Sequence, residues 1–143
     1  MYNYLLAVDG SANAKRAAAY LANLTQLIAD LDITVIHAVN IRREINRFSN
    51  NSTDISLIEQ EAIDRGWQII NEQVAEFNKL GFEVKKQLIN GDPAAKITEF
   101  AKLNNFSHIV LGSRGLTNLQ GIVLGSVSHR ILNLSHCPIT LVK

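Results

Sequence analysis

The residues best suited to chemistry are glycines and serines spaced along one segment late in the chain. Two residues separate Gly112 from Gly115, nine separate Gly115 from Gly125, and Ser126 follows directly. Glycine has no Cβ, so its backbone can adopt positive φ and bring N–H groups close to an anion. The spacing therefore predicts a phosphate-binding loop.

A helix is expected directly after this loop, because Val127, Ile131 and Leu134 recur at helical spacing. Its first N–H groups and positive dipole end would face the same anion. The predicted phosphate contacts are Gly112, Arg114, Gly115, Gly125, Ser126, Val127 and Ser128. Serine hydroxyls can donate to phosphate oxygens, Val127 would offer its backbone N–H, and Arg114 either adds a charge-assisted contact or points into solvent.

Asp9 is a second candidate ligand, since it follows the apolar run 4–8, which is typical of a buried strand. Open α/β sheets bind ligands at the carboxyl ends of their strands. Asp is also among the best N-caps, and a helix is expected to begin near Ser11. The residue types leave these two interpretations equally supported. Gly10 and Ser11 would line the same edge.

Short β-rich runs alternate with segments of helical period along the whole chain, which is typical of an α/β fold with a mainly parallel, open sheet covered on both faces. The five predicted strands are 4–8, 33–39, 82–89, 108–111 and 139–142. The length suits a single domain spanning residues 1–143.

Apolar stripes predict the helices that cover this sheet. One stripe contains Ala17, Leu21, Leu24 and Ile28; a longer one contains Ile63, Trp67, Ile70, Val74 and Phe77, with Gly81 placed to end the helix. Trp67 is predicted to be a core residue rather than a ligand-stacking one. Asp92 and Pro93 predict the cap and first residue of a further helix, in a turn of mainly structural role.

The pattern G-x2-G-x9-G-S after a strand resembles the ATP-binding signature of the universal stress protein family. The segments YLLAVDGS, TVIHAVN, NGDPAAKI and HCPITLVK resemble the family's pattern in the same order, so the resemblance covers nearly the whole chain. It implies a fold similar to the adenine nucleotide alpha hydrolases, which is Rossmann-like. It also implies that Asp9 lies by the nucleotide and that Val39 contacts the adenine region through its backbone.

The resemblance implies an ATP-binding, nucleotide-responsive regulator in stress response, with Mg²⁺ beside the phosphates and at most slow hydrolysis. It further implies a homodimer in which the last strands of two subunits pair. Two alternatives stay open: a nucleotide-independent interaction module of the same fold, and a genuine ATPase or phosphotransferase. The residues do not indicate which side chains would hold the cation.

Motifs that would support phosphoryl transfer are missing. No Gly-Lys-[Ser/Thr] closes the glycine loop, the first strand–helix turn has one glycine, and kinase motifs are absent. The histidines have no partners at metal-ligand spacing, so His37 and His108 are expected within the sheet or at a pocket rim, and His129 and Arg130 on a solvated helix. We therefore predict no catalytic residue. Cys137 is predicted to pack in the core.

The charges are balanced, with 14 basic and 13 acidic residues and a net charge of +1. Such balance argues against a nucleic-acid-binding face or a polybasic membrane anchor. No apolar stretch is long enough to span a bilayer. A single cysteine suits the cytoplasm. A polar insert over residues 42–56 departs from the family pattern and is a candidate for a mobile flap over the pocket.

Overall fold

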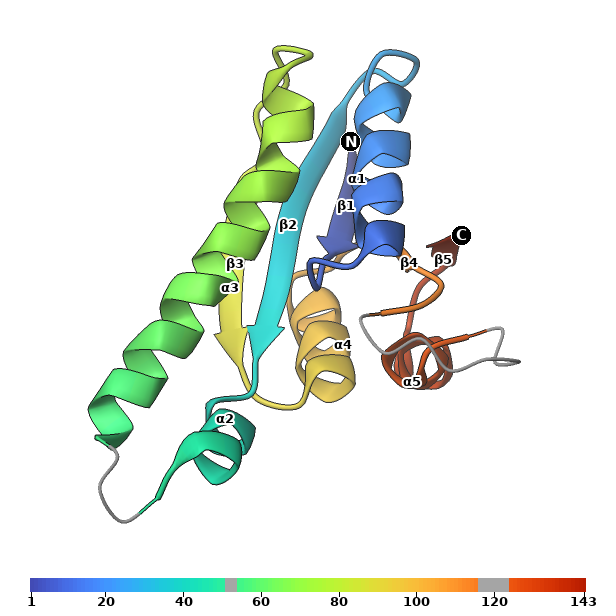
Figure 1. The fold of residues 1–143 in the computed structure, drawn as a ribbon. Helices are drawn as coiled ribbons and strands as arrows, with labels where there is room; N and C mark the ends of the chain where they lie inside the picture. The colour runs from blue at the N-terminus through green and yellow to red at the C-terminus, as the bar shows by residue number, and fades with distance from the viewer. Residues whose placement is uncertain (51–53, 116–123) are drawn as a thin grey trace.

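A computed structural model describes residues 1–50, 54–115 and 124–143. Its five strands form one sheet in the order β3-β2-β1-β4-β5, and every neighbouring pair is parallel (Figure 1). The strands are β1 (Tyr2–Ala7), β2 (Leu31–Val39), β3 (Lys85–Asn90), β4 (His108–Gly112) and β5 (Ile139–Val142). The predicted five-stranded α/β fold is thus confirmed.

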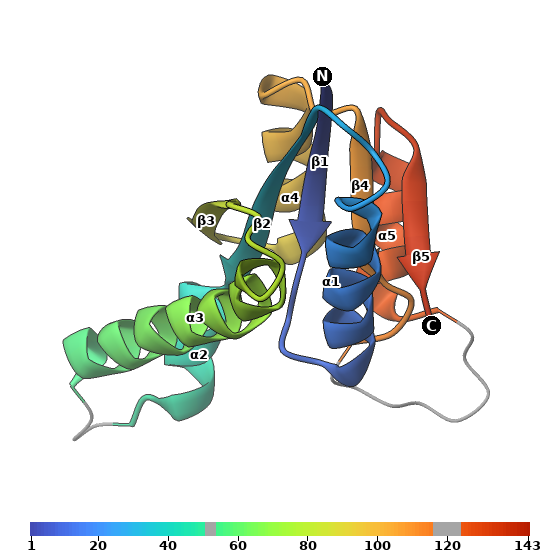
Figure 2. The same ribbon diagram turned by 90° about the horizontal axis from the view of Figure 1, so that it is seen from above.

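Helices cover both faces of the sheet, as Figure 2 shows. The helices are α1 (Ala12–Leu24), α2 (Ile41–Phe48), α3 (Ile55–Asn78), α4 (Pro93–Leu103) and α5 (Ser126–Leu134). On one face, Leu21 of α1 and Ile70 of α3 pack with Leu6 of β1. On the other face, Ile131 of α5 packs with Leu5 of β1 and with α4. Because both faces are covered, the central strand β1 is apolar at successive positions.

The long helix α3 buries Ile70, Val74 and Phe77 of the predicted stripe, but its N-terminal half faces the sheet with other residues. Its buried residues include Ala62, Gly66, Ile70 and Phe77, whereas Trp67 is 39% exposed. The prediction that Trp67 is a core residue is therefore wrong. Gly66 is the reason that α3 can approach closely, since a Cβ there would lie 2.7 Å from Leu88 Cδ1. Because glycine has no apolar side chain, the pattern of apolar residues did not predict this contact.

The polar insert contains regular structure that the sequence did not predict. Helix α2 occupies its first part, up to Phe48, and α3 begins at Ile55. Asn40 caps α2, since its side chain accepts the Arg43 N–H at 3.0 Å. Glu44 ties α2 to α3 through an ion pair with Arg65 at 3.2 Å. No residue of α2 is buried, so these polar contacts hold it.

Other boundaries differ by a few residues. Helix α1 ends at Leu24, so Ile28 lies beyond it, and β3 begins three residues after the predicted start because the chain is still turning at Gly81, where φ is +69°. Asp92 caps α4 and Pro93 is its first residue, as predicted. Among the described residues, no helix is both long and apolar enough to cross a membrane.

Candidate functional site

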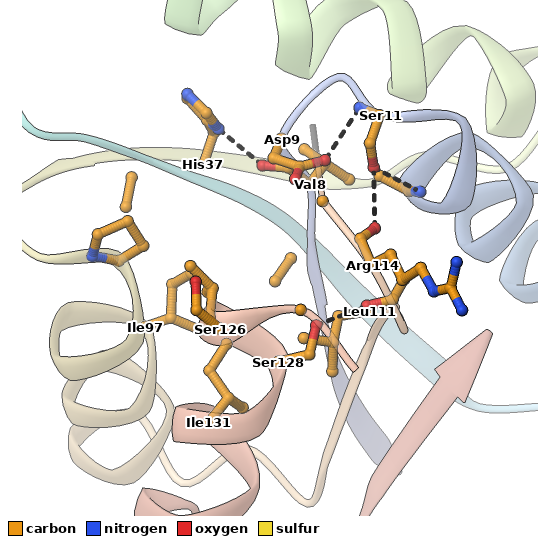
Figure 3. Close-up of a pocket in the computed structure, with 18 of the residues that line it drawn as sticks. Val8, Asp9, Ser11, His37, Ile97, Leu111, Arg114, Ser126, Ser128 and Ile131 are labelled. Carbon is orange, nitrogen blue, oxygen red and sulfur yellow. Dashed lines mark hydrogen bonds between the residues drawn. The ribbon is translucent and has the colours of Figure 1, made fainter. Parts of the chain in front are cut away.

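A cavity opens at the carboxyl end of the sheet, where the chain leaves β1, β2 and β4 (Figure 3). This is the edge at which α/β sheets bind ligands. Nine of the eleven predicted site residues line it: Asp9, Ser11, Gly112, Arg114, Gly115, Gly125, Ser126, Val127 and Ser128. The fold thus brings together residues that lie more than a hundred positions apart in the sequence.

The N-terminus of α5 meets the cavity without a side-chain cap. Gly125 is the N-cap residue, and no side chain among the residues that the structure describes caps the first turn. Side chains cap the other four described helices, namely those of Ser11, Asn40, Asp54 and Asp92. The first N–H groups of a helix have no partner within the helix, and they carry its positive dipole end. An anion placed beside Ser126 would supply the missing acceptor.

The three loop glycines matter for space rather than for backbone conformation. The expected positive φ is wrong for them, because positive φ among the described glycines occurs at Gly10, Gly81 and Gly91. A Cβ on Gly115 would lie 2.6 Å from Asp9 Oδ2. A Cβ on Gly125 would lie 3.3 Å from the Gly115 nitrogen. Each glycine therefore allows two loops to approach closely.

Gly112 has a packing role of the same kind. A Cβ there would lie 2.7 Å from Asn13 Cβ and 2.9 Å from the Ala14 nitrogen. Because Gly112 has no Cβ, the first turn of α1 can lie directly against the end of β4. The Ser128 hydroxyl donates to the Gly112 carbonyl at 2.9 Å, and Ser128 is buried. This hydroxyl therefore fixes α5 to β4 and is not free to donate to a phosphate, in contrast to the prediction.

Asp9 lies at the cavity and does not cap α1. Its Oδ1 accepts the Ser11 N–H at 2.9 Å, and the Ser11 hydroxyl oxygen accepts the Ala14 N–H at 3.1 Å. Ser11 is therefore the cap, and the capping interpretation of Asp9 is wrong. Among the described lining residues, Asp9 carries the one carboxylate. Its orientation is fixed by the turn that leads into α1.

The Arg114 backbone also belongs to this turn, because the Ser11 hydroxyl donates to the Arg114 carbonyl at 3.4 Å. In Figure 3 the Arg114 guanidinium is directed away from Ser126 and Ile97. A contact between Arg114 and phosphate stays a prediction. Ser126 is exposed, and so is Val127, at 37%.

Gly10 and Val39 are predicted site residues that do not line the cavity. Gly10 has φ of +81° and lies beside Ile69 of α3. The Val39 carbonyl accepts the Gly91 N–H at 2.9 Å, and Val39 is buried. The backbone contact between Val39 and adenine stays a prediction.

His37 lines the cavity from β2, which confirms its expected place in the sheet or at a pocket rim. Its Nδ1 lies 2.6 Å from the Val8 carbonyl oxygen, so a neutral ring donates from Nδ1. Burial lowers the pKa of His37 below its usual value, although the hydrogen bond with Val8 and the charge of Asp9 act in the opposite direction.

Sequence reasoning missed Arg43 of α2 and the apolar wall of the cavity. Arg43 lies in the insert, for which no element was predicted. The wall is formed by Ala7, Pro93, Ile97, Leu111 and Ile131. Because Ala7, Ile97, Leu111 and Ile131 are also core residues, their apolar character alone could not indicate that they face a ligand. The wall is suited to an aromatic base, because ligand pockets are mostly apolar with a few polar groups.

The remaining candidates are structural. His108 stacks on Tyr4 with ring centroids 4.7 Å apart, and its Nε2 lies 2.7 Å from the Thr140 hydroxyl oxygen. His129 is exposed, as predicted, and Arg130 forms a surface ion pair with Asp92 at 2.8 Å. Cys137 is only partly buried, against the core that contains α4. Within the described ranges, no group of three His, Cys, Asp or Glu side chains could hold a metal ion.

Comparisons with known proteins place these features in a family. The model of the universal stress protein family matches residues 1–143. The universal stress protein YxiE of Bacillus subtilis is 32% identical over an alignment of 155 positions, which covers all of both chains. Universal stress protein MJ0531 of Methanocaldococcus jannaschii is 30% identical, over 75% of this chain and 71% of its own.

Solved structures share the fold. MJ0577 of Methanocaldococcus jannaschii aligns with a TM-score of 0.82 at 24% identity, covering 99% of this chain and 95% of its own. A universal stress protein of Archaeoglobus fulgidus, solved with dAMP, gives 0.71 at 22% identity over 100% and 98% of the two chains. One from Arabidopsis thaliana, solved with AMP bound, gives 0.73 at 20% identity over 100% and 92%.

Proposed function

We propose that this chain, which belongs to the universal stress protein family, binds an adenine nucleotide in the cavity at the carboxyl end of its sheet. The observation that carries the proposal is the uncapped N-terminus of α5, which meets the cavity at Gly125 and Ser126. Phosphate oxygens would accept hydrogen bonds from the first N–H groups of this helix.

The rest of the cavity suits the nucleoside part of such a ligand. Its apolar wall includes Ala7, Pro93 and Ile97, which can bury a base. The relatives solved with dAMP and AMP bind ligands of this class. We propose adenine nucleotides on the combined support of this geometry and those relatives.

Within that class we propose ATP accompanied by Mg²⁺. Magnesium is usually held by one or two carboxylates together with substrate phosphates and water. Asp9, as the carboxylate of the described lining, is the residue that fits this role. Bound Mg²⁺ would neutralise negative charge on the phosphates, because the positive dipole end of α5 offsets only a part of that charge.

The role that we propose is a nucleotide-responsive regulator in the stress response, with at most slow ATP hydrolysis. The described lining contains no lysine that could reach the terminal phosphates. His37 has one ring nitrogen engaged by Val8, which limits its use as a base. We place this role in the cytoplasm, since a chain with a single cysteine suits a reducing compartment.

We also propose a homodimer formed through β5. This strand is the last of the sheet and pairs only with β4 among the described strands. Its outer edge has backbone groups that another strand can satisfy. A second copy of the chain would offer the same edge, as a two-fold interface requires.

Calorimetric titration of the nucleotide-free protein with ATP and Mg²⁺ tests the binding. Two matched variants, Gly125→Asp and Gly125→Asn, each add a side chain that can cap α5. Both place the same Cβ 3.3 Å from the Gly115 nitrogen, so any loss of stability from crowding is shared and cancels in the comparison between them. The aspartate places a negative charge where the phosphate would lie, and we expect at least tenfold weaker ATP binding than in the Asn variant.

Equal affinity in the Asp and Asn variants would place the phosphate elsewhere. No binding of ATP or AMP by the native protein would favour the alternative of a nucleotide-independent interaction module. Rapid release of inorganic phosphate from ATP with Mg²⁺ would instead favour the enzyme alternative.

A further inference from the structure

We propose that Arg43 contacts the base of the bound nucleotide and thereby links occupancy of the cavity to helix α2. This inference rests on the proposed nucleotide binding, because it assumes that the phosphates lie at the N-terminus of α5. The insert that contains Arg43 would then be a part of the binding site rather than a spacer between β2 and α3.

The sheet order places Arg43 at the end of the cavity away from α5. Strands β2 and β4 lie on opposite sides of β1, and α2 follows β2 whereas α5 comes after β4. Both Arg43 and Ser126 line the cavity, so they face it from opposite sides. A nucleotide whose phosphates meet Ser126 would direct its nucleoside end toward Arg43.

The Arg43 guanidinium is available for a ligand. In residues 1–50, 54–115 and 124–143 it forms no hydrogen bond or ion pair, although Glu44 beside it pairs with Arg65 at 3.2 Å. The Arg43 backbone N–H is held by Asn40 at 3.0 Å. The backbone of this residue is therefore fixed at the rim of the cavity while its side chain keeps all its donors.

The position of Arg43 in α2 is unfavourable for the helix itself. Arg42 and Arg43 are the second and third residues after the cap, where a cation opposes the positive end of the helix dipole. Acidic residues are preferred in this turn. Helix stability therefore does not explain an arginine here, which is consistent with a role in ligand binding.

The Arg43 guanidinium is a planar group among the described lining residues that can stack on the face of a purine base. No Phe, Tyr or Trp is present among its described lining residues. The planar, weakly hydrated guanidinium stacks on aromatic rings, which the compact ammonium group of lysine cannot do equally well. The structure therefore assigns Arg43 to the base rather than to the phosphates.

Titrations with AMP and with adenosine test this assignment, using Arg43→Ala, Arg43→Lys and Arg42→Ala. Arg42 is the matched control, because it is exposed on the same helical turn and does not line the cavity. We expect Arg43→Ala to weaken both ligands by the same factor, about tenfold. Arg43→Lys should not restore the loss, and Arg42→Ala should bind within about twofold of the native protein.

Amide hydrogen exchange of α2 gives a second measurement, which would not respond to AMP if Arg43 had only a structural role. In the native protein, bound AMP should slow amide exchange over residues 44–48 of α2. In the Arg43→Ala variant, AMP added to the same fractional saturation should leave this exchange unchanged. A loss for AMP without a loss for adenosine would show a phosphate contact and overturn the assignment, as would equal affinities in the two alanine variants. Absence of nucleotide binding by the native protein would instead refute the proposed function, and this inference with it.

Discussion

His37 is a titratable side chain that the fold buries beside the cavity. Its Nδ1 lies 2.6 Å from the Val8 carbonyl oxygen, and burial lowers its pKa below the usual value of 6.5. In the unfolded chain the ring takes up a proton as the pH falls through 6.5, whereas in the folded protein it does so only at lower pH. Protonation therefore favours the unfolded state within this window.

We predict that the free energy of unfolding decreases as the pH falls below 6.5 and that His37→Asn flattens this dependence. Asparagine can still donate a hydrogen bond to Val8 but does not titrate. Urea unfolding of both proteins at several pH values between about 5 and 8 measures the effect. Burial also lowers the pKa of His108, so a residual slope should persist in the variant. Identical slopes would show that His37 does not contribute.

The glycine loop could be located from the sequence, but the reason for its glycines could not. Spacing alone identified Gly112, Gly115 and Gly125 as members of one site, and all three line the cavity. A side chain on Gly112 or Gly115 would collide with a segment distant in the sequence, as a Cβ on Gly115 would with Asp9. Such contacts depend on how the sheet assembles, so local patterns of residue types do not reveal them.

At the scale of elements, the sequence predicted the cap of α4 correctly, whereas Asp9 was a wrong candidate for the cap of α1, which is Ser11. In α4, Pro93 follows Asp92, and both occupy the predicted positions. Helix α2 was not readable, because none of its residues is buried and its polar sequence has no stripe tied to the core. The contacts that hold it are the cap of Asn40 on the Arg43 N–H and the ion pair of Glu44 with Arg65 of α3.

We predict that the cap formed by Asp92 matters more than its ion pair with Arg130. The Asp92 carboxylate accepts the Ala95 N–H at 3.1 Å and also contacts Arg130 at 2.8 Å, but the pair is exposed to solvent. Asp92→Ala removes both contacts and should cost about 1 kcal/mol, as for other N-caps. Asp92→Asn keeps the cap and should cost much less, because exposed ion pairs contribute little.

Denaturant unfolding of the two Asp92 variants measures this difference. An equal loss of stability in both would mean that the ion pair, not the cap, holds α4 and α5 together. Arg130→Ala is the matched control, since it breaks the pair while leaving the α4 cap intact.

At the scale of the molecule, the alternation of strands and helices predicted the architecture without predicting strand order. Apolar runs show which segments are buried, and each strand was expected near its observed place. The order β3-β2-β1-β4-β5 then follows from crossover connections that pack helices on both faces. This order places the ends of β2 and β4 beside β1, which creates the cavity, and it leaves β5 as an edge strand.

The edge at β5 gives a prediction for the assembled molecule. The Pro138 and Val142 carbonyls accept hydrogen bonds from the N–H groups of Ile109 in β4 and of Ser113 directly after it. Residues of a strand alternate in the side to which their backbone groups point, so the Leu141 N–H faces away from β4. Leu141→Pro removes this outward N–H, whereas Leu141→Ala removes a similar amount of side chain and keeps it. We expect native protein and Leu141→Ala to sediment as dimers and Leu141→Pro as a monomer, measured by analytical ultracentrifugation over a range of concentrations.

The alanine variant decides between two causes of dissociation. If loss of apolar side-chain packing were sufficient, both variants would become monomeric; if backbone pairing between edges holds the dimer, only the proline variant would. A native protein that remains monomeric at every concentration would refute pairing through β5. The Ser113 N–H donates to the Val142 carbonyl, and the Ser113 carbonyl accepts the Gly125 N–H, so strand β5 is linked through Ser113 to the predicted phosphate loop. Added nucleotide should therefore strengthen the native dimer and leave the proline variant monomeric.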